Sequence, residues 1–114
     1  MDKAELIGVE EFGRVDMRVG VVREVVAFPE ARKPAWKVRV DFGPDLEERW
    51  TSAQVTNYTA DELIGRRVIG AINLGTRRIA GFESAFLLLG AVQDDGSVVL
   101  LDVADDAAPG SRVA

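Results

Sequence analysis

The sequence predicts an all-β domain, a small barrel of five or six short strands with short helices. Apolar and polar residues alternate over several stretches of four to eight residues, which is the period of a half-buried strand. Eleven glycines and four prolines interrupt these stretches at the positions expected for turns. The 114 residues carry no internal repeat or linker, so residues 1–114 are expected to form one domain.

The N-terminal elements are a short helix and a first strand. The apolar residues of Leu6–Phe12 are spaced for a helix of limited length. From Val15 the period becomes two, and Val15–Val21 reads as a half-buried strand. Beyond Gly20 the alternation slips by one residue, which predicts a bulge or sharp bend near that glycine.

The middle of the chain predicts two more strands and one helix. Trp36–Phe42 alternates cleanly, with charged residues on the face opposite the apolar one. Glu48–Ala53 is a short, polar third strand. Thr59 with Glu62 three residues later is a capping box, and it predicts one or two helical turns that end at Gly65.

The last third of the chain predicts the remaining strands, Val68–Leu74, Ala85–Ala91 and Val98–Val103. A turn over 94–97 joins the last two as a hairpin, and 104–114 is expected to be loop. A helix between the third and fourth strands is the element order of an OB-fold, a five-stranded Greek-key barrel. A β-sandwich is the alternative, but it usually has more strands.

The composition argues for a binding protein over an enzyme. The chain has no cysteine and no histidine, so thiol nucleophiles, most zinc sites and the commonest general base are missing. We expect no cofactor and no metal. The acidic N-terminal segment does not resemble a signal peptide, and no apolar run is long enough to span a membrane, so a cytoplasmic protein is expected.

Charge is unevenly distributed along the chain. The net charge is −5, but segments 1–13, 44–50 and 94–114 carry −3, −2 and −4, whereas 14–43 carries +3 and 51–93 carries +1. This pattern suggests a basic face on an acidic protein. A merely solvated charged surface is the alternative.

Two polar stretches in the first half are candidates for function. Asp16 and Arg18 lie on one face of the first strand, where an ion pair that stabilises the barrel is the favoured interpretation. In Phe28–Trp36, the cations Arg32 and Lys33 lie on a proline-stiffened loop beside aromatic residues, an arrangement that suits single-stranded nucleic acid. Trp36 itself is in phase with the core, and Lys37 and Arg39 extend the basic strip on the opposite face.

Two further polar stretches follow. Thr51–Tyr58, which contains Gln54, is rich in amides and hydroxyls; these groups can read base edges or hold a peptide, or they can satisfy a loop backbone. In Asn73–Ser84, Arg77 and Arg78 lie between glycines in the loop that joins two late strands, next to the usual ligand face of an OB barrel. The planar guanidinium group suits phosphate.

Together these stretches resemble the CsaA-type tRNA-binding-domain proteins. The resemblance is carried by Asp16–Gly20, Phe28–Gly43, Ser52–Gln54, Tyr58 with Glu62–Gly65, and Asn73. It implies an OB-fold homodimer that acts as a chaperone for unfolded or export-bound polypeptides and is also able to bind tRNA. Two departures from the family pattern are Ala85-Phe86 after Ser84 and the proline-free Leu74-Gly75-Thr76.

The predicted contacts with tRNA or polypeptide combine the basic strip with positions that the resemblance implies. The resemblance carries over Lys33, Lys37, Arg39, Gln54, Asn73, Arg77 and Ser84, and the basic strip adds Arg32 and Arg78. We expect the six cations among them, Arg32, Lys33, Lys37, Arg39, Arg77 and Arg78, to form one basic face around the loops of Gln54 and Asn73. The alternative function is a dedicated tRNA-binding protein with no chaperone role.

Overall fold

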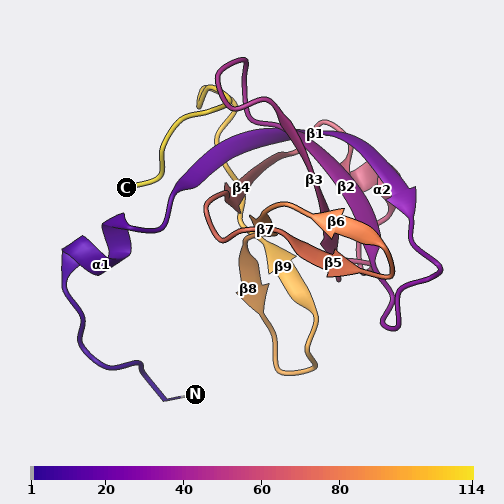
Figure 1. The fold of residues 1–114 in the computed structure, drawn as a ribbon, viewed down its shortest axis with the longest axis horizontal. Coiled ribbons are helices and arrows are strands. Elements are labelled where there is room, and N and C mark those ends of the chain that lie inside the picture. The colour runs from indigo at the N-terminus through magenta and orange to yellow at the C-terminus, as the bar shows by residue number, and fades with distance from the viewer. Residues whose placement is uncertain (1) are drawn as a thin grey trace.

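The computed structural model describes residues 2–114 and consists mainly of short strands (Figure 1). Five antiparallel strands form one sheet in the order β3-β2-β1-β4-β7. Their bounds are β1 (Met17–Ala27), β2 (Trp36–Asp41), β3 (Glu48–Ala53), β4 (Arg67–Ala71) and β7 (Leu87–Leu88). Two hairpins and two helices complete the fold: β5 (Arg77–Ile79) with β6 (Phe82–Ser84), β8 (Gly90–Val92) with β9 (Val98–Leu100), α1 (Val9–Gly13), and α2 (Ala60–Leu63).

The two ends of the sheet meet and nearly close a barrel. The N–H of Ala85, just before β7, donates to the carbonyl of Trp50 in β3 at 2.8 Å. Beside it, the hydroxyl of Thr51 donates to the carbonyl of Phe86 at 2.7 Å. Helix α2 lies between β3 and β4 in the chain. The predicted five-stranded OB barrel is therefore confirmed.

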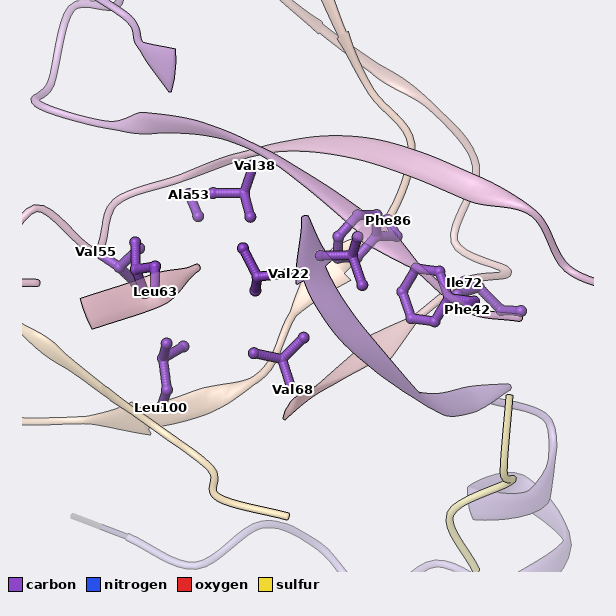
Figure 2. Packing of buried hydrophobic residues seen from close by; sticks show 11 residues of the cluster. Val22, Val38, Phe42, Ala53, Val55, Leu63, Val68, Ile72, Phe86 and Leu100 are labelled. Atoms are coloured by element: carbon purple, nitrogen blue, oxygen red, sulfur yellow. The ribbon is translucent and has the colours of Figure 1, made fainter. Parts of the chain in front are cut away.

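The barrel interior is filled by aliphatic and phenylalanine side chains (Figure 2). Phe42 and Phe86 pack edge to face, with ring centroids 5.0 Å apart. Gly70 makes room for both rings, because a Cβ there would lie 2.7 Å from Phe42 and 2.8 Å from Phe86. The alternation predicted for β2 is confirmed, since Val38 and Val40 are completely buried.

The slip predicted in the first strand occurs at Arg23, three residues later than expected. The pairing of β1 with β2 shifts between Val22 and Glu24. The predicted position was wrong because Gly20 itself faces the core, although it has no apolar side chain to mark that face in the sequence. A Cβ at this position would meet the Phe42 ring at 2.9 Å. Val22 therefore continues the inward face, and the strand runs unbroken through the bulge to Ala27.

The C-terminal segment has no regular structure, as predicted, but it is bound to β1 by backbone hydrogen bonds. The N–H of Val19 donates to the carbonyl of Ser111 at 2.9 Å, and the N–H of Gly110 donates to the carbonyl of Val19 at 2.7 Å. The N–H of Val113 donates to the carbonyl of Met17 at 2.9 Å. The C-terminal segment therefore pairs with the first residues of β1, along the edge where β2 pairs only from Val21 onward.

The helices agree with the sequence patterns. In the capping box, the Glu62 N–H donates to the hydroxyl of Thr59 at 3.2 Å, and the Thr59 N–H donates to the Glu62 carboxylate at 2.8 Å. Gly65 follows with a φ of +82°. In the part of the chain described, no helix is long and apolar enough to cross a membrane.

Three late strands are shorter than predicted. Strand β4 ends at Ala71, and β9 ends at Leu100. The stretch predicted as one strand over Ala85–Ala91 is divided, because β7 pairs with β4 whereas β8 pairs with β9. The predicted arginine loop is the β5–β6 hairpin, whose turn residues Ala80 and Gly81 both have positive φ, at 47° and 81°.

Candidate nucleic-acid interface

A broad groove lies between the 28–35 loop, the end of β3 and the β5–β6 hairpin, with a volume of about 1020 Å³. It is the place where the structure gathers most of the predicted cations. The predicted residues that line it are Arg32, Lys33, Gln54, Arg77 and Arg78. They come from three segments that are far apart in the sequence.

The groove carries excess positive charge. Its ionisable lining consists of four cations and one carboxylate, that of Glu30. Within residues 2–114, Arg32, Lys33 and Arg77 form no ion pair. Arg78 pairs with Glu83 across the hairpin at 3.0 Å. Three uncompensated cations therefore face this space and are available to an anionic ligand.

The 28–35 loop presents its cations because its two ends are anchored. Phe28 and Ala35 are buried, whereas Lys33 at the tip is exposed. The N–H of Ala31 donates to the carbonyl of Phe28 at 3.2 Å and closes a turn. Pro29 and Pro34 restrict the backbone on either side of the tip, which lowers the entropy lost when a ligand orders the loop.

Lys37 does not line the groove, but it contacts both of its walls. Its Nζ lies 4.7 Å from the ring centroid of Phe28, at the start of the loop, and 5.0 Å from that of Phe82, in the hairpin. The two rings are 5.5 Å apart, edge to face. This cluster of one cation and two aromatic rings attaches the hairpin to the loop.

Arg39 also lies outside the groove, and its charge is compensated. Its guanidinium group donates to Glu48 and, at 3.1 Å, to Glu24. These hydrogen bonds, chiefly the one to Glu48, raise the pKa of Arg39 above its ordinary value. The pairing register places Glu24 directly opposite Arg39, and it places Glu48 diagonally across from Arg39, because Glu48 pairs with Asp41.

Two of the predicted polar contacts bind other parts of the protein. Asn73 accepts from the N–H of Asp16 at 2.8 Å and donates to the carbonyl of Arg14 at 2.7 Å. Ser84 is buried, and its hydroxyl contacts that of Thr51 at 2.8 Å. Neither residue lines the groove.

The interpretation of Asp16 and Arg18 as a structural pair is confirmed. Their side chains form an ion pair at 2.6 Å, and Arg18 also donates to the carbonyl of Gly110 at 3.0 Å. The pair helps to hold the C-terminal segment against β1.

A second concave region was missed from the sequence. It is a cleft of about 580 Å³ on the outer face of the barrel, lined by Val26, Lys37, Glu48, Arg49, Trp50, Phe82, Glu83 and Ala85. Trp36, the tryptophan next to the predicted basic loop, packs against the core, and its indole N–H donates to the Tyr58 carbonyl at 3.0 Å. Trp50 was detectable by its phase, since it alternates with the buried Thr51 and Ala53.

These features define a class of protein, a small OB-fold domain with a basic groove and an aromatic cleft on its surface. The family model described as "Putative tRNA binding domain" matches residues 17–112. The chain therefore belongs to this tRNA-binding domain family.

Relatives of known name fall into two groups. The chain is 36% identical over 112 residues to methionine–tRNA ligase of Methanococcus maripaludis strain C5, and 38% identical over 111 residues to that of Porphyromonas gingivalis strain ATCC 33277. These matches cover 98% and 96% of the chain but only 16% of each ligase. The chain thus spans about one sixth of the length of the curated relatives it matches.

The second group consists of solved structures of similar size. The CsaA chaperone protein of Picrophilus torridus is 42% identical, with a TM-score of 0.89, and the match covers 96% of this chain and 100% of that one. Chaperone CsaA of Bacillus anthracis strain Ames is 36% identical, with a TM-score of 0.90 and the same coverage. The resemblance to CsaA-type proteins is confirmed.

Proposed function

We propose that this protein binds tRNA through the basic groove and that it acts by binding, not by catalysis, in the cytoplasm. The observation that carries the proposal is the convergence of Arg32, Lys33 and Arg77, each without a carboxylate partner among the described residues, on one groove. Membership of the tRNA-binding domain family supports it.

The groove supplies two kinds of contact. The three cations suit phosphates, and the Gln54 amide has both a donor and an acceptor for a base edge. Each phosphate neutralised changes the slope of log K against log salt by about −0.7 for single strands. Three contacts predict a slope of about −2, so the affinity should fall about 20-fold between 50 and 200 mM salt.

The test is a tRNA titration at several salt concentrations with charge-removing variants. Arg77→Gln and Lys33→Gln should each flatten the slope by about 0.7, and the double variant by about 1.4. Arg14→Gln is the matched control, because Arg14 is an exposed cation outside the groove and, like the groove cations, forms no ion pair within the described residues. If the control flattens the slope as much as the groove variants, tRNA is held by overall charge and the groove is not its site.

We further propose that the protein is a chaperone that binds unfolded or export-bound polypeptides. The cleft favours this function, because Trp50, Phe82, Val26 and Ala85 offer apolar surface to a side chain. The CsaA chaperone proteins support it by their similarity over their whole length. The test is suppression of aggregation of a chemically unfolded protein. A dedicated tRNA-binding protein would bind tRNA and have no effect on aggregation.

We also propose that the chain forms a homodimer. Leu6, Ile7, Val9 and Phe12 in the N-terminal segment are exposed. Burial of such side chains contributes about 25 cal/mol per Å² of apolar surface, which favours a partner subunit. Light scattering should give about twice the 12.4 kDa of one chain. A mass near that of one chain at micromolar concentration would exclude the dimer.

A further inference from the structure

One edge of β3 is only partly paired. Along one of its two edges, β3 pairs with β2 over its whole length. Along the other edge, called the outer edge below, the carbonyl of Trp50 accepts from the Ala85 N–H, and the N–H of Ser52 donates to the Ser84 hydroxyl at 3.1 Å. Every second residue of a strand points its backbone N–H and carbonyl groups toward the same edge. The backbone groups of Glu48 therefore point toward the outer edge, as those of Trp50 and Ser52 do.

Three backbone groups are therefore free at this edge. Within the described residues, the N–H and carbonyl of Glu48 and the N–H of Trp50 have no backbone partner across the outer edge. An exposed strand edge with free donors and acceptors is a template for a further strand. Here it borders the cleft, because Glu48, Arg49 and Trp50 are also three of its lining residues.

The cleft next to this edge suits an apolar side chain better than a polyanion. Its ionisable lining is balanced, with the cations Lys37 and Arg49 and the carboxylates of Glu48 and Glu83. The basic groove, in contrast, carries excess positive charge. Trp50 and Phe82 meet edge to face in the cleft, with centroids 6.2 Å apart, and form an apolar wall.

We propose that an extended polypeptide segment binds by adding a strand to β3 along Glu48–Trp50 and by placing one apolar side chain in the cleft. This inference rests on the polypeptide-binding function proposed above and specifies its site and geometry. Backbone hydrogen bonds give such a complex affinity without a sequence requirement, and the single pocket selects for an apolar residue. That combination suits a protein that holds many different unfolded chains.

The polypeptide site is separate from the tRNA groove. The two sites share no lining residue: the groove uses Arg77–Ile79 of β5, whereas the cleft uses Phe82 and Glu83 of β6. The hairpin that contributes to both lies beside β3 (Figure 1). One protomer can therefore hold tRNA and polypeptide at the same time.

The test uses the wild-type protein and a fluorescein-labelled peptide, Ser-Thr-Ser-Leu-Ser-Thr-Ser, followed by fluorescence anisotropy. Two N-methylated versions are compared: one is modified at the leucine and at the two threonines two places from it, and the other at the two serines next to the leucine. An added strand points alternate N–H groups toward β3. One version should lose at least tenfold in affinity while the other stays within about threefold of the parent peptide.

Variants of the protein test whether the peptide binds at the cleft. Phe82→Ala should weaken the parent peptide at least fivefold, whereas Arg77→Gln should not change its affinity. Saturating tRNA should leave peptide affinity within about threefold, and direct competition would refute separate sites. Equal effects of the two N-methylation patterns, or no binding of the parent peptide, would overturn strand addition. Aggregation suppression that persists in either case would leave the polypeptide-binding function standing, and its absence would remove that function too.

Discussion

Replacing Ser84 with alanine tests whether this serine stabilises the barrel or contacts the ligand. The hydroxyl of Thr51 donates to the Phe86 carbonyl at 2.7 Å, so in the 2.8 Å contact with Ser84 the donor must be Ser84. Ser84 also accepts from the Ser52 N–H at 3.1 Å. Ser84→Ala leaves that N–H unpaired in the closing seam of the barrel. An unsatisfied buried donor costs about 1–3 kcal/mol, and we expect a loss of about 2 kcal/mol.

Urea unfolding measures this loss directly. With an unfolding entropy of about 2.1 cal/mol/K per residue, a 2 kcal/mol loss lowers Tm by about 8 °C in a chain of this length. Thr51→Val removes the partner hydroxyl, so the costs of the two changes should be coupled by about 1 kcal/mol in a double-mutant cycle. Binding of tRNA to the folded variant should be unchanged. A Ser84→Ala variant that unfolds like the wild type but loses tRNA affinity would refute this reasoning and make Ser84 a ligand contact.

Two more predictions concern the core and the capping box. Gly70→Ala places a Cβ against the rings of Phe42 and Phe86, and this overpacking should cost about 1–3 kcal/mol in urea unfolding; Gly13→Ala is the control, since its Cβ meets nothing within 4 Å, and equal costs would contradict the packing argument. Hydrogen bonds from the backbone N–H and then the hydroxyl of Thr59 lower the pKa of Glu62. Because the folded-state pKa is the lower one, this stabilisation is present at neutral pH and is lost as the pH falls through it. Glu62→Gln should therefore unfold more easily than the wild type at pH 7 but not at acidic pH, and a difference that does not depend on pH would exclude this ionic contribution.

Much of the barrel could be predicted because it depends on neighbours close in the chain. The strict alternation of Trp36–Phe42 has one solution, with Val38 and Val40 inside. The capping box at Thr59 is complete within four residues, and it sets where α2 begins. The slip in β1 was detectable, but its place was not, because Gly20 has no side chain to show which face points inward.

The candidate site depends partly on the sequence and partly on the tertiary structure. The sequence alone determined that the cations of the 28–35 loop and of the β5–β6 segment would be exposed, since no apolar pattern called for their burial. Only the tertiary structure decided which cations stay free for a ligand. Strand register brings Glu24 and Glu48 to either side of Arg39, and the hairpin brings Phe82 over Lys37. Pairing partners come from segments distant in sequence, so local periodicity determines which face a residue occupies but not which charge or ring it meets there.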